Sequence, residues 1–190
     1  MGGVTSRQEG TTEIAVRVAA ASDVGRKRSQ NEDNHAMRMT DGTGPRGGEV
    51  LLVVSDGMGG SLAGEVASQI TVETVVSQYQ DDQGEDVGEA LRRALEGANR
   101  AVRERNTTDP SLAGMGATCT AAVVSERHAW VAHVGDSRAY LIRHGRIRRL
   151  TQDHSLVAKL VERHELSPSD ARVDPRRNVV TRCVGYAQPV

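Results

Sequence analysis

A short apolar run followed at once by an acidic, glycine-rich turn is the feature that most constrains the fold of this chain. Residues 50–55 read VLLVVS, and the turn Asp56-Gly57-Met58-Gly59-Gly60 comes directly after them. An apolar run of this length, partly β-branched and bounded by glycine, predicts a buried strand. The sequence therefore predicts a sheet in which a carboxylate stands at the end of a buried strand.

Two long helices are predicted after this turn. Leu62, Val66 and Ile70 recur at a spacing of four, and the apolar pattern continues to Tyr79. Residues 87–102 carry a second apolar stripe at helical spacing, with charged residues on the opposite face. Residues 81–85 are expected to link the two helices.

Strand-like segments stand on both sides of these helices. We expect strands at 14–19, where apolar and other residues alternate, and at 35–39, 118–124, 129–134, 137–143 and 146–150. A short helix is expected at 155–165, and residues 1–12 are expected to form a disordered leader before a domain at 13–190. This order of elements predicts the α+β class, with helices covering sheets built mainly from hairpins.

Charge and composition exclude several functions. The chain has 190 residues, with 24 basic and 25 acidic side chains, and 2% of its residues are aromatic. A balanced charge with so few stacking side chains argues against a nucleic-acid partner. There is no apolar run long enough for a membrane span. The two cysteines, Cys119 and Cys183, indicate reduced, buried thiols in a cytoplasmic protein.

Two acidic motifs are candidates for metal binding. Arg28-Ser29-Gln30-Asn31-Glu32-Asp33 holds adjacent carboxylates, which need a cation when both are ionised; the alternative is a solvated charged loop. Asp56 and the glycines after it offer the carboxylate and carbonyl oxygens that Mg²⁺ and Mn²⁺ take. The alternative there is a tight strand-to-helix turn. Neither a phosphate-binding P-loop nor a dinucleotide fingerprint fits the spacing of these glycines.

Two motifs further along the chain each allow more than one interpretation. Gly135-Asp136-Ser137-Arg138-Ala139 is spelled like a serine-hydrolase elbow, but a strand rather than a helix is expected after it, so we reject a serine nucleophile and keep Asp136 as a candidate metal ligand. In residues 150–155, Asp153 or Ser155 is expected to cap the following helix. Arginines at 143, 146, 148 and 149 are expected on the solvated face of a hairpin, although a protein-docking surface would have the same composition.

Taken in order, these motifs resemble the metal-dependent protein serine/threonine phosphatases, the PPM or type 2C family, and its bacterial branch in particular. The matching segments are G-x-x-R-x-x-N-E-D at 25–33, V-x-D-G-M-G-G at 54–60, M-G-A-T at 115–118, V-G-D-S-R-A-Y at 134–140 and L-T-x-D-H-S at 150–155. The resemblance covers residues 14–185. It implies a four-layer α-β-β-α sandwich and a hydrolase that removes phosphate from phosphoserine and phosphothreonine.

The resemblance also implies roles for individual residues. Asp56 would bridge two Mn²⁺ or Mg²⁺ ions, the Gly57 carbonyl and Glu32 would bind one of them, and Asp33 would hold metal-bound water. Asp136 would help to bind a third ion in bacterial members. Arg28 would clamp the substrate phosphate as the catalytic, phosphate-binding residue. The implied reaction is an in-line attack on phosphorus by a metal-activated water, without a phospho-enzyme.

The chain departs from the family pattern in two places. Met58 stands where many eukaryotic relatives carry a histidine proposed as general acid, and methionine has no proton to donate. The C-terminal aspartate segments of the family, and with them the last strands of the sandwich, are missing from the sequence. The alternative function is therefore a catalytically impaired relative that binds phosphoproteins through Arg28 or regulates a kinase. A stress-regulator phosphatase is a third interpretation, against which the Arg28 to Asp33 motif argues.

The family resemblance also sets expectations for partners. The substrates would be phosphoproteins made by serine/threonine kinases, including such a kinase itself. We expect a monomer that acts in cytoplasmic signal transduction, with no nucleic-acid or membrane partner.

Overall fold

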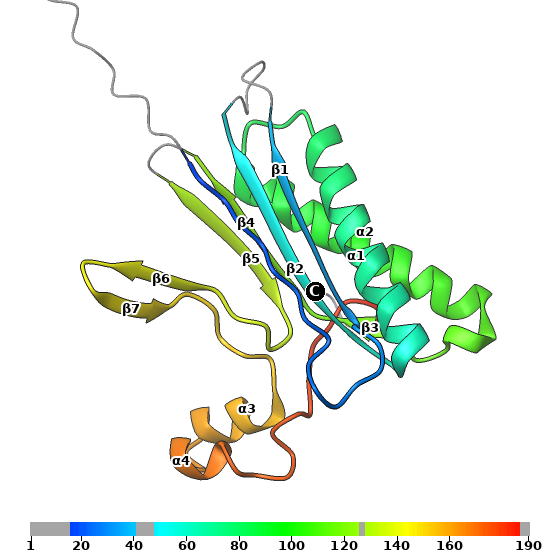
Figure 1. Ribbon diagram of the computed structural model, residues 1–190, viewed down its shortest axis with the longest axis vertical. Helices are drawn as coiled ribbons and strands as arrows, with labels where there is room; N and C mark the ends of the chain where they lie inside the picture. The colour runs from blue at the N-terminus through cyan, green and yellow to red at the C-terminus, as the bar shows by residue number, and fades with distance from the viewer. Residues whose placement is uncertain (1–15, 41–47, 126–127, 187–190) are drawn as a thin grey trace, which may run out of the picture.

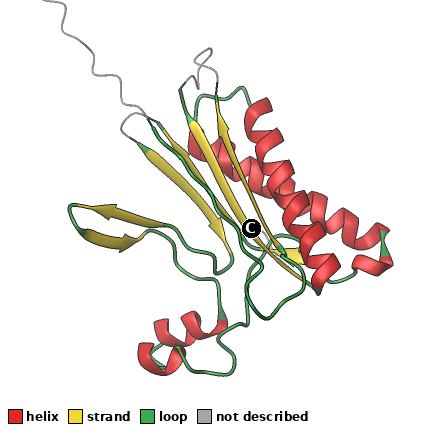
Figure 2. Ribbon diagram, viewed as in Figure 1, coloured by secondary structure: helices red, strands yellow, loops and turns green. Residues whose placement is uncertain are grey.

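The computed structural model describes residues 16–40, 48–125 and 128–186. Within them, an antiparallel sheet has the strand order β1-β2-β4-β5, and the very short β3 pairs with the end of β2. The helices α1 and α2 lie together along one face of this sheet, and β6 and β7 form a separate two-stranded sheet (Figures 1 and 2). The strands are β1 Asp33–Met39, β2 Val50–Met58, β3 Gly116–Ala117, β4 Cys119–Val124, β5 Ala129–Val134, β6 Tyr140–Arg143 and β7 Arg146–Arg149. The helices are α1 Ser61–Asp81, α2 Val87–Thr108, the 3-10 turn η1 Pro110–Leu112, α3 Leu156–Glu162 and α4 Pro168–Ala171.

The two faces of the sheet differ in burial, as the side chains of β2 show. Val53 is 1% exposed and belongs to the core under the helices, whereas its neighbour Val54 is 51% exposed on the other face. Successive side chains of a strand point to opposite faces, so one covered and one open face produce this alternation. Asp56 continues the open-face series at the end of β2, and Gly57 returns to the helix side.

Small and apolar side chains build the contact between the helices and the sheet. Ala67 of α1 and Ala94 and Ala98 of α2 are fully buried in the same core cluster as Val53. Alanine at these positions lets the two helices approach each other and the sheet closely. Helix α2 begins at a side-chain cap, because the Asp86 carboxylate accepts a hydrogen bond from the Glu89 amide at 3.0 Å.

Most of the predicted elements are confirmed, including both long helices and the α+β class. The strand expected at 14–19 is wrong in its described part, because residues 16–19 are irregular and pair with no described strand. Alternation makes a segment suitable for a sheet, but a strand also needs a partner for its backbone groups. The predicted leader, residues 1–12, lies outside the described residues.

Two smaller expectations also have outcomes. Ser155, not Asp153, caps α3: the Ser155 hydroxyl accepts from the Ala158 amide. Cys119 and Cys183 are both buried and unpaired, as expected. No helix in the described part of the chain is long and apolar enough to cross a lipid bilayer.

Candidate active site

The end of β2 is held in place by Thr118, which lies between β3 and β4. The Ser55 hydroxyl donates to the Thr118 carbonyl at 2.7 Å, and the Asp56 amide donates to Thr118 Oγ1 at 2.9 Å. The Thr118 amide in turn donates to the Asp56 carbonyl at 2.8 Å. Three hydrogen bonds to one residue fix the backbone that carries the Asp56 carboxylate. The sequence motif contained Thr118, but only the structure shows this role.

Gly57, Gly64 and Glu32 pack closely together because the two glycines have no side chains. The Gly57 amide donates to the Glu32 carbonyl at 3.1 Å. A Cβ atom at Gly57 would lie 2.8 Å from that carbonyl oxygen and would overlap the backbone of Gly64 in the first turn of α1. A Cβ at Gly64 would lie 2.5 Å from Glu32 Oε2. Glycine at both positions therefore lets the Glu32 carboxylate sit against the beginning of α1.

Arg28 stands at the mouth of the same site. Its Nη1 lies 3.5 Å from Glu32 Oε1, and 62% of the Arg28 side chain is exposed, against 11% for Glu32. The carboxylate is thus enclosed, while the guanidinium reaches into solvent. A guanidinium in this position is available to a ligand that approaches from outside.

Asp136 comes to the site from the loop after β5. Gly135 before it has a φ of +108°, and a Cβ there would lie 2.6 Å from Thr118 Cβ. The Gly135 carbonyl accepts from the His154 amide at 2.7 Å, and the Gly135 amide donates to His154 Nδ1 at 3.1 Å. This loop is therefore anchored on both sides. The chain continues from Ser137 toward β6 and not into a helix, as the rejection of a serine nucleophile required.

A cavity of about 670 Å³ joins most of the predicted site residues. Arg28, Glu32, Asp56, Gly57 and Asp136 all line it. Asp33 does not line it, but Asp33 pairs with Asp56 across β1 and β2. Met58 borders the cavity from the end of β2, and Asn178 and Val180 close it from the C-terminal loop. The last two carried no motif, so sequence analysis missed them.

The Asp56 carboxylate is repelled by two other carboxylates, Asp33 and Asp136. Burial, followed by repulsion from Asp33 and Asp136, raises the pKa of Asp56 to about 6. A hydrogen bond with Asp33 raises this pKa further, and the nearby Arg28 charge lowers it. Carboxylates that repel one another in this way are stabilised by a cation.

The donors at the site fit Mg²⁺ or Mn²⁺ by type. The residues that line the cavity include the carboxylates Glu32, Asp56 and Asp136, and hard divalent cations prefer such oxygen ligands. No group of three or more His, Cys, Asp or Glu side chains is arranged to hold an ion, as far as the described residues extend. Mg²⁺ keeps several water ligands and takes only one or two carboxylates, so it does not need such a cage.

The raised pKa of Asp56 predicts how the metal-free chain responds to pH. Between about pH 4 and pH 6 the folded chain holds a proton that the unfolded chain has released, so the free energy of unfolding falls as the pH rises. Because the carboxyl is half-buried and partly screened, we expect a loss of only ~1 kcal/mol. In urea unfolding with a chelator, the stability of the wild type relative to Asp56→Asn should drop by this amount between pH 4 and pH 7. A difference that stays constant with pH would contradict the prediction.

Comparison with known proteins identifies the family. The family model described as protein phosphatase 2C matches residues 18–189. This chain belongs to the protein phosphatase 2C family. The chain is 34% identical over 171 residues to the serine/threonine protein phosphatase PstP of Mycobacterium tuberculosis, covering 90% of this chain and 31% of PstP. It is 34% identical over 168 residues to the serine/threonine phosphatase stp of Listeria monocytogenes, covering 86% of this chain and 65% of that protein.

Solved structures of phosphatases share the fold of this protein phosphatase 2C chain. The serine/threonine phosphatase of S. agalactiae superposes with a TM-score of 0.79 at 33% identity, covering 88% of this chain and 68% of that one. The catalytic domain of PstP in complex with two manganese ions superposes with a TM-score of 0.73 at 33% identity, covering 90% of this chain and 69% of that one. The expected phosphatase fold is confirmed.

Proposed function

We propose that this chain carries the catalytic site of a protein serine/threonine phosphatase. The observation that supports this proposal is a cavity lined by Arg28, Glu32, Asp56, Gly57 and Asp136 in a member of the protein phosphatase 2C family. A cation on one side and hard oxygen donors on the other suit a phosphate monoester, which is an anion that also binds divalent metals.

Some residues of the site would bind the phosphate and others would bind the metal ions. The Arg28 guanidinium would donate two parallel hydrogen bonds to phosphoryl oxygens, because its planar fork matches their spacing. Carboxylate oxygens of Asp56, Glu32 and Asp136 and the Gly57 carbonyl would hold Mn²⁺ or Mg²⁺, with Asp33 acting beside Asp56. Such ions, when bound, acidify a water molecule and neutralise phosphoryl charge. Met58 supplies no proton to the leaving group, so another group has to do so.

Several finer points belong to this proposal. We expect two ions, because the PstP structure contains two manganese ions, and the family resemblance implies a third ion at Asp136. The substrates would be phosphoserine and phosphothreonine proteins, including a serine/threonine kinase. We further propose a cytoplasmic monomer; the two buried, unpaired cysteines support a reducing compartment.

Hydrolysis assays with Arg28 variants test the proposal. The chain should hydrolyse p-nitrophenyl phosphate and a phosphothreonine peptide when Mn²⁺ is added. Arg28→Ala should lower kcat/KM for the peptide by about 100-fold, since two charge-assisted hydrogen bonds are lost. Arg28→Lys should recover part of this loss, because lysine keeps the charge but not the fork. Arg103→Ala, an exposed arginine of α2, is the matched control and should leave kcat/KM unchanged.

A binding module without catalysis is the second candidate function. Among the described residues, no three His, Cys, Asp or Glu side chains are placed to hold an ion together, and this favours the binding module if the metal needs such a set of protein ligands. Titration calorimetry with Mn²⁺ separates the two candidates. A folded chain that binds the phosphothreonine peptide through Arg28, takes up no Mn²⁺ and hydrolyses neither substrate would replace the phosphatase proposal with this one.

A further inference from the structure

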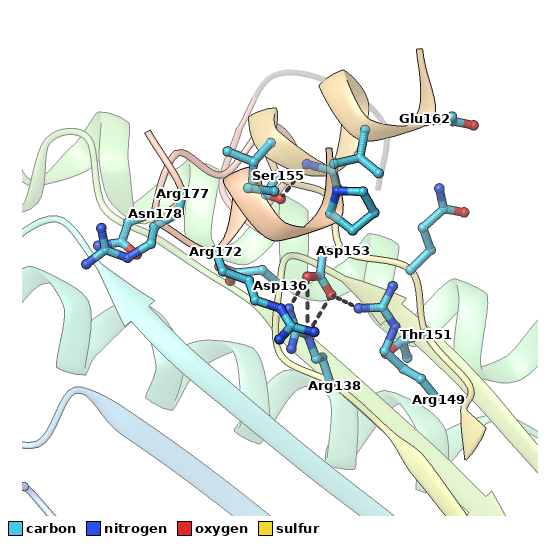
Figure 3. A pocket seen from close by; sticks show the side chains of 16 residues that line it. Asp136, Arg138, Arg149, Thr151, Asp153, Ser155, Glu162, Arg172, Arg177 and Asn178 are labelled. Carbon is cyan, nitrogen blue, oxygen red and sulfur yellow. Dashed lines mark hydrogen bonds and ion pairs between the residues drawn. The ribbon is translucent and has the colours of Figure 1, made fainter. Parts of the chain in front are cut away.

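A second cavity, of about 920 Å³, lies next to the candidate active site. Asp136 and Asn178 line both cavities, so the two adjoin each other there. The second cavity is lined by residues at the base of the β6–β7 hairpin, by α3 and by the segment around α4 (Figure 3). We call it the arginine pocket, after its lining residues Arg138, Arg149, Arg172 and Arg177.

Asp153 holds two of these guanidiniums in the wall of the pocket. Its carboxylate is 10% exposed and accepts from Arg138 Nε at 2.9 and 3.1 Å, one distance to each oxygen. Arg149 Nη1 lies 3.4 Å from the same carboxylate. One carboxylate of low exposure thus orients two cations, and it neutralises only one of the two charges. Figure 3 shows this group, with Asp153 between Arg138 and Arg149.

Arg172 adds a positive charge with no carboxylate of its own. No ion pair or hydrogen bond of its side chain is found in the described part of the chain, and the residue is exposed. The Glu162 carboxylate lines the rim but lies apart from the Asp153 group in Figure 3, and Asp136 faces the neighbouring candidate metal site as well. The lining of the pocket therefore has an excess of guanidinium charge, and Arg172 keeps N–H donors that no described residue uses.

We propose that the arginine pocket binds a second oxyanionic side chain of the phosphoprotein substrate, near the phosphorylated residue in the active site. This inference rests on the proposed phosphatase function, because the two cavities adjoin and one extended peptide can enter both. The chemistry is that of a phosphate or carboxylate held by the guanidiniums of Arg149 and Arg172. A phosphoserine carries more charge than a glutamate, so it should be the better ligand.

Binding of three matched peptides tests the inference without any turnover. Each carries one phosphothreonine, and a second position holds phosphoserine, glutamate or glutamine; the spacing is varied over two to six residues. Fluorescence anisotropy with the 190-residue chain and a chelator measures the dissociation constants. At the best spacing, the phosphoserine peptide should bind about 10-fold tighter than the glutamine peptide, with glutamate in between. If the glutamate peptide binds as tightly as the phosphoserine peptide, the pocket accepts the carboxylate of an unphosphorylated acidic residue equally well.

Arginine variants test whether the tighter binding of the phosphoserine peptide, relative to the glutamine peptide, depends on the arginine pocket. Arg172→Gln and Arg149→Gln should each reduce the advantage of about 10-fold to less than about 3-fold. Arg172 has no side-chain partner in the described chain, so its loss should leave the thermal unfolding midpoint unchanged. Arg103→Gln removes the same charge from α2 and should preserve the advantage. Equal affinity for all three peptides, or an equal weakening of all three by Arg172→Gln, overturns the inference.

A parallel assay separates this inference from the proposed function. p-Nitrophenyl phosphate has a single phosphate and no flanking residue, so its Mn²⁺-dependent hydrolysis should be the same for the wild type and Arg172→Gln. If the wild type does not hydrolyse p-nitrophenyl phosphate, the phosphatase proposal is refuted. The peptide affinities measured by anisotropy do not depend on that result. Hydrolysis without any preference among the peptides would refute the arginine pocket alone.

Discussion

Asp56→Asn is expected to lower Mn²⁺-dependent hydrolysis of p-nitrophenyl phosphate by on the order of 10³-fold, because several kcal/mol of metal-derived stabilisation are lost. Asparagine has the shape of aspartate, and the Asp56 amide keeps its hydrogen bond to Thr118. Asparagine lacks the negative charge with which Asp56, among the neighbouring carboxylates, would bind the cation. Calorimetry should show weaker Mn²⁺ uptake together with the loss of hydrolysis.

Stability measurements show whether this loss is local. The wild-type carboxyl has a raised pKa because it is buried and because Asp33 and Asp136 repel it, so at pH 7 the asparagine variant should unfold at the same or a higher urea concentration. Asp81→Asn, at the exposed end of α1, is the matched control and should change neither hydrolysis nor Mn²⁺ uptake. An Asp56→Asn chain that hydrolyses substrate at the wild-type rate would remove Asp56 from the proposed site.

Gly57→Ala is expected to have the largest effect on folding, a loss of about 3 kcal/mol in the free energy of unfolding. The added Cβ would overlap the Gly64 backbone and lie 2.8 Å from the Glu32 carbonyl oxygen. Backbone atoms cannot rotate away as a side chain can, so α1 or the loop at Glu32 has to move. The same movement would displace the Glu32 carboxylate, so hydrolysis should fall together with stability.

Gly88→Ala provides the control for this experiment. Gly88 lies in α2, and the nearest atom to a Cβ there is Asp86 Oδ1 at 3.3 Å. Since alanine is the better helix former, this variant should be neutral or gain up to ~1 kcal/mol. Urea unfolding of both variants measures the difference. If Gly57→Ala is as stable as Gly88→Ala, the close approach of β2 and α1 is not a constraint on the fold.

Periodicity and motif order predicted the elements that are long or strongly patterned. Both long helices and β2 follow from apolar spacing, because burial on one side selects those residues. Asp56 could be singled out as a candidate because it follows a buried strand directly. The two-residue β3 carries too few side chains to show a period. Helix α4 has a signal that was missed: Ser167 precedes a proline and accepts from the Asp170 amide, which is a helix start.

The spatial relations of the site were beyond the sequence alone. Spacing along the chain shows neither that Asp33 pairs with Asp56 nor that Asn178 reaches the same cavity. These relations depend on strand register and on the path of long loops, which are fixed by packing of the whole domain. Asp153 illustrates the same limit: its local pattern predicted a cap, whereas it holds Arg138 and Arg149.

The hydrogen bonds of Thr118 have a consequence for the order of folding. They connect residues 62 and 63 positions apart in the chain, so no local segment can assemble the end of β2 in its final form. Pairing of such distant segments loses the entropy of loop closure before their contacts form. The pairing therefore accompanies the folding of the whole sheet. The Asp56 amide should then exchange its hydrogen only when the sheet as a whole opens. The candidate site therefore forms only in the fully folded chain. Ligand binding at this site accordingly requires a complete sheet.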